Sequence, residues 1–144
     1  ELHDVPGGGL VINDAYNANP DSMAVALQSL AGLRRAGGRL VAIVGDMLEL
    51  GPDTAAHHRR VGELAAESGV EVLIAVGAQA SEVAAGAAGK GLVAVEVSDA
   101  AAAAQVAAGT IRPGDVVLVK ASRGLALEAV AQRLLVGAAA ESER

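Results

Sequence analysis

The feature that most constrains the fold is a regular alternation of short aliphatic runs with longer, helix-like segments. The runs at residues 40–44, 72–76 and 116–120 are rich in Val, Ile and Leu and lack the polar alternation of a strand that faces water on one side. Such strands are covered on both faces, and helices placed between successive strands provide that cover. The sequence therefore predicts an α/β domain that is Rossmann-like and doubly wound, with a mostly parallel sheet and helices on both faces.

Start and stop signals predict where the helices lie. Asn19 is a favourable N-cap and Pro20 suits a first helical position, so we expect a helix over 20–36 that ends at Gly37. Asp53 should cap a second helix over 54–68. The other expected elements are strands at 10–13 and 92–97 and helices at 81–85, after residue 98 and at 125–136.

Composition narrows both the core and the possible partners. The 144 residues suit one domain, and because Tyr16 is the only aromatic residue, Ala, Val, Leu and Ile must fill its interior. A net charge of −6 and the lack of an aromatic row argue against nucleic acid. No run reaches the roughly 20 apolar residues of a membrane span. The absence of cysteine is compatible with a reducing compartment, so we expect a cytoplasmic protein.

The ends of the chain indicate a piece of a longer protein. Residue 1 is Glu rather than Met, and a run of three glycines at 7–9 comes before the first strand-like segment. We interpret residues 1–9 as a linker from a missing upstream domain, 10–136 as the domain itself and 137–144 as a frayed tail.

Several motifs of this fold class are missing. The nearest approach to a Walker A loop, around Lys90, lacks both its first Gly and its final Ser or Thr, and no G-x-G-x-x-G follows a strand. His57 and His58 are helix neighbours about 100° apart, so we interpret them as packing residues rather than metal ligands. Glu63, Glu67 and Glu71 are interpreted as a solvated helix face and its exit.

Ligands of doubly wound sheets sit outside the carboxyl ends of the strands, so the loops at 14–19, 45–52, 77–80 and 120–124 are the candidate site. The first of these places Asp14, Tyr16, Asn17 and Asn19 within six residues. A carboxylate at a strand end is well placed to accept hydrogen bonds from ribose hydroxyls. The alternative is a turn whose only task is to cap the following helix.

Two further loops bear charged groups. The loop 45–52 holds Asp46 and Glu49 between glycines, and Lys120, Ser122 and Arg123 follow the strand at 116–120. Two cations, a hydroxyl and the start of a helix form an anion-binding combination. The alternative is that Lys120 and Arg123 merely pair with Asp46 or Asp14.

Three segments together are similar to a known family. They are DAYNANPDSM at 14–23, VGDMLELG at 44–51 and KASR at 120–123. In this order they resemble Mur ligases of the MurF type, and the likeness extends over about residues 10–136. The family more usually has Ser at position 15 and Gly at position 121, where this chain has Ala.

The resemblance implies a role within a three-domain enzyme. It implies ATP and Mg²⁺ as cofactors, with the phosphate and metal sites mainly in a missing central domain, and UDP-N-acetylmuramoyl-tripeptide and D-alanyl-D-alanine as substrates. It places Asp14, Tyr16 and Asn17 at the ATP ribose. The acceptor dipeptide would meet a second set: Asn19, Asp46, Lys120, Ser122 and Arg123. No catalytic residue is implied in this part of the chain, which would be inactive without the amino-terminal and central domains.

Two other functions stay open at this point. The domain could be a self-contained Rossmann-like module that binds a nucleotide or small ligand in a regulatory role. It could also belong to a related amide ligase, such as the diaminopimelate-adding or folylpolyglutamate enzymes, although the YNANP run at 16–20 argues against these. An in-frame G-x-x-G-K-S/T segment upstream of the chain would favour a ligase over a regulatory module.

Overall fold

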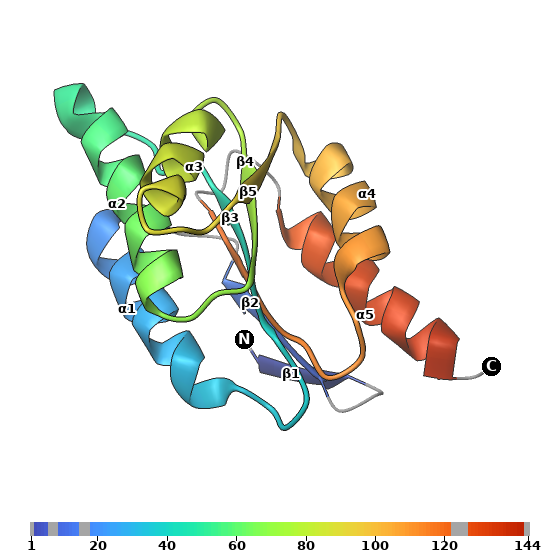
Figure 1. Cartoon of the computed structure of the whole chain (residues 1–144). Helices are drawn as coiled ribbons and strands as arrows, with labels where there is room; N and C mark the ends of the chain where they lie inside the picture. Colours follow the sequence, from blue (N-terminus) through green and yellow to red (C-terminus); the bar gives the residue numbers. More distant parts are fainter. Residues whose placement is uncertain (1, 6–8, 15–17, 122–126, 143–144) are drawn as a thin grey trace.

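The computed structural model describes residues 2–5, 9–14, 18–121 and 127–142. This part of the chain forms one six-stranded sheet in the order β1-β2-β6-β3-β4-β5 (Figure 1). Strands β2, β6, β3, β4 and β5 are mutually parallel, and β1 alone runs antiparallel, against β2. The strands are β1 (Leu2–Val5), β2 (Gly9–Asp14), β3 (Leu40–Gly45), β4 (Val72–Val76), β5 (Ala94–Val97) and β6 (Val116–Lys120). The predicted mostly parallel sheet is therefore confirmed.

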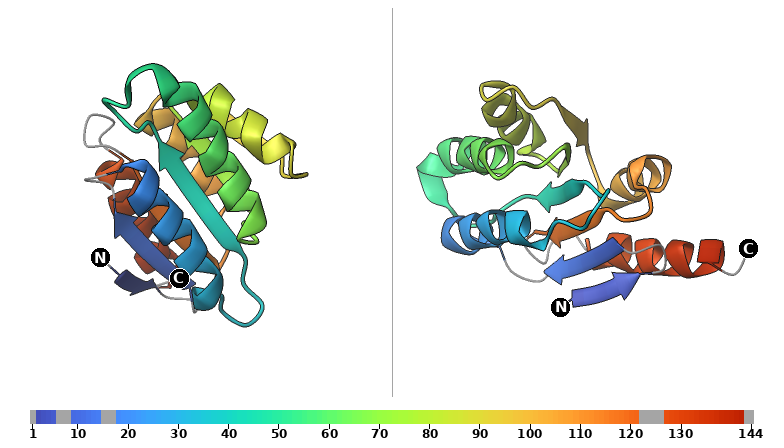
Figure 2. Two further views of the ribbon diagram at one scale, coloured as in Figure 1. Left: turned by 90° about the vertical axis from the view of Figure 1, so that its left-hand side faces the viewer. Right: turned by 60° about the horizontal axis from the view of Figure 1, so that its bottom comes forward.

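Helices cover both faces of the sheet, as the aliphatic strands require (Figures 1 and 2). One face is covered by α1 (Pro20–Leu30), α2 (Thr54–Glu67) and α3 (Ala80–Ala88), and the other by α4 (Ala100–Thr110) and α5 (Glu128–Ser142). Each face has its own apolar cluster, and every residue of β3 is buried between them. None of the described helices is long and apolar enough to cross a membrane.

Two glycines set the distance between α2 and α3. A Cβ atom at Gly62 would lie 1.9 Å from the Val83 carbonyl oxygen, and one at Gly86 would lie 1.8 Å from the Arg59 carbonyl oxygen. Real Cβ atoms do not approach that closely, so the two backbones touch only because both positions lack a side chain. In a core without large rings, small residues allow such close packing.

Asp115 ties together the amino ends of the central strands. Its side chain accepts hydrogen bonds from the Arg39 guanidinium (2.8 Å) and from the backbone N–H of Arg39 (3.1 Å) and Arg112 (2.8 Å). Burial by itself would raise the pKa of Asp115, but the hydrogen bonds from Arg39 and from the Arg112 backbone N–H, together with the charge of Arg39, outweigh it and hold that pKa below its usual value. The same contact raises the pKa of Arg39.

Several element boundaries differ from the sequence prediction. Helix α1 ends at Leu30 rather than at residue 36, and a short 3₁₀ turn, η1 (Ala31–Leu33), follows it. This turn contains Gly32, and glycine disfavours the continuation of an α-helix because of its backbone flexibility. Helix α3 is longer than expected, because its Ala-rich sequence has high helix propensity. Strand β5 starts two residues later than predicted. Asp53 does not cap α2 with its side chain, since the 3₁₀ turn η2 (Gly51–Asp53) leads directly into the helix.

Secondary structure extends further toward both ends of the chain than the sequence predicted. Residues 2–5, which we expected within a linker, form β1, whose pairing with β2 only the tertiary structure could reveal. Helix α5 continues to Ser142, past the predicted end at 136, so residues 137–142 of the predicted tail are helical.

Candidate functional site at the carboxyl edge of the sheet

The strand order creates a topological switch point around β6. The helices that follow β2 and β3 lie on one face of the sheet, whereas α5, which follows β6, lies on the other (Figure 1). β6 lies between β2 and β3. At its carboxyl end the chain therefore turns toward one face of the sheet, whereas at the carboxyl ends of both neighbouring strands it turns toward the other face. Such a divergence leaves a crevice in which doubly wound proteins bind ligands.

An ion pair between Asp14 and Lys120 occupies this switch point. The two residues are register partners at the carboxyl ends of β2 and β6, and the Lys120 ammonium donates to Oδ2 of Asp14. The Lys120 side chain is only 2% exposed, whereas that of Asp14 is 45% exposed. A buried ammonium is tolerated only when opposite charge and hydrogen bonds compensate its lost hydration. Lys120 thus fixes one oxygen of a carboxylate that still faces the crevice.

Asn19 is committed to the start of α1. Its side-chain oxygen accepts from the Ser22 backbone N–H at 2.8 Å, and the Ser22 hydroxyl oxygen accepts from the Asn19 backbone N–H at 3.1 Å. This reciprocal pair is a capping box, which confirms the predicted N-cap. The helix-capping alternative therefore holds for this end of the loop.

Asp46 lies at the carboxyl end of β3 and holds the next loop along the sheet. Its two carboxylate oxygens accept from the backbone N–H groups of Ala78 (3.0 Å) and Gln79 (2.9 Å), and the residue is 9% exposed. Gly77 has φ +108°, and a Cβ atom there would lie 2.6 Å from the carboxylate. In this arrangement Asp46 positions the 77–79 loop, and its predicted contact with a substrate stays a prediction.

His58 anchors the glycine-bracketed loop and was not singled out for this by its sequence. The ring is 1% exposed, its Nε2 accepts from the Met47 N–H at 3.0 Å, and its Nδ1 lies 2.7 Å from the Thr54 carbonyl oxygen. This geometry assigns a neutral ring with the proton on Nδ1. The packing interpretation is confirmed for His58. The sequence signal for its burial was its position three residues before the apolar Val61, since residues three apart lie on the same face of a helix.

A groove beside α1 reaches the candidate site. It encloses about 670 Å³ and is lined by Leu2, Ile12, Asp14, Asn19, Asp21, Ser22, Val25, Ala26, Ser29, Leu33 and Leu118. The groove joins apolar walls to the half-exposed carboxylate of Asp14. Four of the predicted site residues, Tyr16, Asn17, Ser122 and Arg123, lie outside the described residues, so the structure does not test their roles.

Comparison with known proteins decides the family. The family model described as Mur ligase, glutamate ligase domain, matches residues 1–123. The chain belongs to the Mur ligase family. This confirms the resemblance drawn from the three sequence segments, and it favours a ligase over a self-contained regulatory module.

Individual Mur ligases show which branch of the family the chain resembles. It is 42% identical over 147 residues to the UDP-N-acetylmuramoyl-tripeptide–D-alanyl-D-alanine ligase of Mycobacterium bovis, an alignment covering 89% of this chain and 29% of that protein. A crystal structure of MurF from Acinetobacter baumannii superposes with a TM-score of 0.83 at 29% identity, over 94% of this chain and 30% of that one. MurF from Thermotoga maritima, solved in complex with ADP, superposes with a TM-score of 0.77 at 25% identity, over 98% of this chain and 31% of that one.

These Mur ligases are much longer than the present sequence. The chain spans under a third of the length of the M. bovis ligase.

Proposed function

We propose that this chain is the carboxy-terminal domain of an ATP-dependent ligase that joins D-alanyl-D-alanine to UDP-N-acetylmuramoyl-tripeptide in the cytoplasm. The observation that supports this most directly is the Asp14–Lys120 ion pair at the switch point of the sheet. Asp14 and Lys120 come from two of the three segments that resemble MurF-type ligases, and they are 106 residues apart in sequence. Asp46, from the remaining segment, directly follows the neighbouring strand β3.

Asp14 is the residue that we assign to the ATP ribose. Lys120 engages one of its oxygens, and the side chain is still 45% exposed, so the carboxylate can accept hydrogen bonds from two vicinal hydroxyls. The apolar walls of the groove beside it suit the sugar and base better than they suit phosphates. Tyr16 and Asn17 follow Asp14 directly and are proposed to complete this nucleotide contact.

The acceptor dipeptide is assigned to the neighbouring strand ends. Arg123 would bind its terminal carboxylate in a bidentate manner, and Ser122 and Lys120 would supply further donors. Asn19 and Asp46 would contribute mainly by positioning, because their side-chain oxygens already hold helix α1 and the 77–79 loop.

The chemistry requires parts that other domains would supply. ATP phosphorylates the tripeptide carboxylate, the dipeptide amine attacks the acyl phosphate, and the tetrahedral intermediate releases phosphate. The resemblance to MurF-type ligases assigns Mg²⁺, together with the P-loop, to the central domain. The contribution of the present domain would be positioning of the two substrates and exclusion of water.

The proposal is tested with the protein in its natural length. Phosphate release should require ATP, UDP-N-acetylmuramoyl-tripeptide and D-alanyl-D-alanine together, and mass spectrometry should detect the pentapeptide product. Replacing the dipeptide with diaminopimelate or glutamate tests the related ligases, and neither should support turnover. Binding of a nucleotide without turnover under any of these conditions would favour the regulatory module instead.

Variants separate the two binding roles. Arg123→Ala should raise KM for D-alanyl-D-alanine while leaving KM for ATP nearly unchanged. Asp14→Asn should raise KM for ATP, and circular dichroism should verify that the variant is folded, since Lys120 loses its carboxylate. An unchanged KM for both substrates in both variants would remove these residues from the site.

A further inference from the structure

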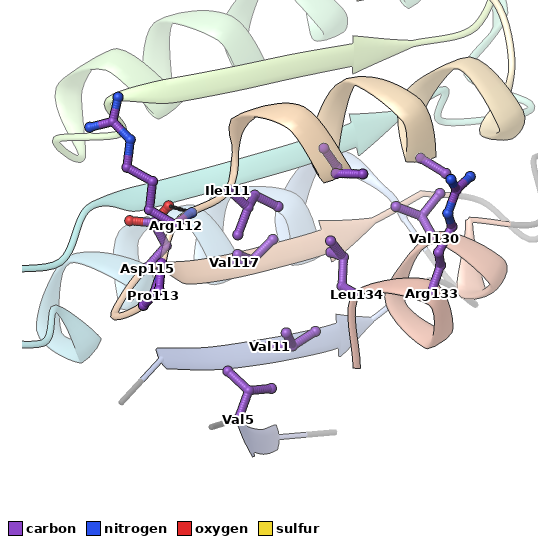
Figure 3. A pocket seen from close by; sticks show the side chains of 13 residues that line it. Val5, Val11, Ile111, Arg112, Pro113, Asp115, Val117, Val130, Arg133 and Leu134 are labelled. Atoms are coloured by element: carbon purple, nitrogen blue, oxygen red, sulfur yellow. Dashed lines mark hydrogen bonds between the residues drawn. The ribbon is translucent and has the colours of Figure 1, made fainter. Parts of the chain in front are cut away.

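A second cavity lies toward the amino-terminal ends of the strands, whereas Asp14 and Lys120 lie at their carboxyl ends. It encloses about 190 Å³ between α4, α5 and the amino-terminal halves of β2 and β6 (Figure 3). Val11 and Val117 line it, and each lies three residues before Asp14 or Lys120 on the same strand, a distance of roughly 10 Å. The cavity is therefore separate from the proposed ligase site.

Small side chains create this cavity. Ala104, Ala107 and Ala108 line it from α4, and Val130 and Leu134 line it from α5. Figure 3 shows Ile111, Val117 and Leu134 turned toward one another around the space. The chain has no Phe or Trp to fill it. An apolar protein cavity of about 150 Å³ stays dry and binds benzene, so this cavity has room for a single ring.

Two of the residues that line the cavity are cationic. Arg112 and Arg133 line it and are exposed, and neither side chain forms an ion pair with a carboxylate of the described residues. The one acid in the lining, Asp115, is already engaged by Arg39 and by backbone N–H groups. Figure 3 shows Arg133 rising from α5 beside Val130, whereas Arg112 extends away from the apolar side chains. Arg133 is thus the better placed cation.

We propose that this cavity binds a small aryl carboxylate, with the ring between α4 and α5 and the carboxylate at Arg133. The volume limits the apolar part to one ring, and the Arg133 guanidinium, which has no ion-pair partner among the described residues, selects an anion although the protein as a whole has a net charge of −6. This site is additional to the nucleotide and dipeptide contacts, and it does not depend on the ligase assignment.

Benzoate is the probe, and binding is measured directly by methyl NMR on the protein in its natural length. The methyl resonances of Ile111, Val117 and Leu134 should shift saturably, with a Kd on the order of 1 mM for a ligand of this size. Benzyl alcohol, which has the same ring without the charge, should bind about fivefold more weakly. Equal affinity for the alcohol would overturn the anionic specificity.

Two variants and two matched controls locate the ligand. Arg133→Gln should weaken benzoate binding about fivefold, whereas Arg60→Gln, the same charge change on α2, should not. Ala108→Leu places a larger side chain at the cavity and should weaken binding at least about tenfold, whereas Ala101→Leu on an exposed position of α4 should have no effect. Absence of saturable shifts in the parent protein, or equal loss in variant and control, would overturn the proposal.

Discussion

The contact between α2 and α3 offers a sharp test of how this core is packed. Gly62 and Gly86 let the two helices approach until a Cβ atom at either position would lie within 2 Å of a carbonyl oxygen of the other helix. The change Gly62→Ala adds a single methyl group at this contact. The substitution brings two opposing effects, and the structure decides which is larger.

Helix propensity by itself favours Ala over Gly by about 1 kcal/mol. The added methyl, however, would lie 1.9 Å from the Val83 carbonyl oxygen, which is backbone and cannot rotate away. The helices must separate by more than 1 Å to relieve the overlap, and overpacking of this kind costs about 1–3 kcal/mol or more in cores. A backbone overlap of this depth belongs at the upper end of that range, so after the propensity gain of about 1 kcal/mol we expect a net loss of about 2 kcal/mol, which for a domain of this size lowers Tm by about 4–8 °C.

The matched control is Gly109→Ala. Gly109 lies in α4, is exposed, and a Cβ atom there would have nothing within 4 Å. Only the propensity gain remains, so this variant should be more stable by about 0.5–1 kcal/mol. Urea unfolding followed by circular dichroism measures both changes. The reasoning is refuted if Gly62→Ala is as stable as the parent, or if the two variants shift in the same direction.

Three further predictions concern buried polar groups. The pKa of Asp115 is depressed in the folded protein, so its carboxylate stabilises the fold at pH values above its unfolded-state pKa of about 3.9. This contribution is lost as pH falls through the folded-state pKa. The urea midpoint of Asp115→Asn should therefore change less on acidification than that of the parent. His58→Ala leaves the Met47 N–H without its acceptor and should cost about 1–3 kcal/mol, whereas His57→Ala should be nearly neutral by the same measurement. Lys120→Ala should be less stable than Lys120→Met, which fills the same space without a charge; equal stability would mean that the buried stem of Lys120 contributes nothing.

Local pattern was sufficient for much of the fold. The strands at 72–76 and 116–120 have the predicted bounds, because continuous β-branched runs have one stable environment, a sheet covered on both faces. The capping box at Asn19 was also predictable, since its partners lie within one helical turn. The alternation of elements then restricted the topology, and the three segments at strand ends indicated the family.

Contacts between distant parts of the chain were decided by the tertiary structure. The sequence left two acids open as partners of Lys120, and the register selected Asp14, which lies directly opposite Lys120 on β2, whereas on β3 the partner of Lys120 is Val44. Asp46 instead accepts hydrogen bonds from the backbone N–H groups of Ala78 and Gln79, in the loop that follows β4. The antiparallel β1 and the cavity between α4 and α5 follow no local periodicity. Sequence spacing specifies which face of an element is apolar, whereas packing alone determines which element that face meets and what space remains.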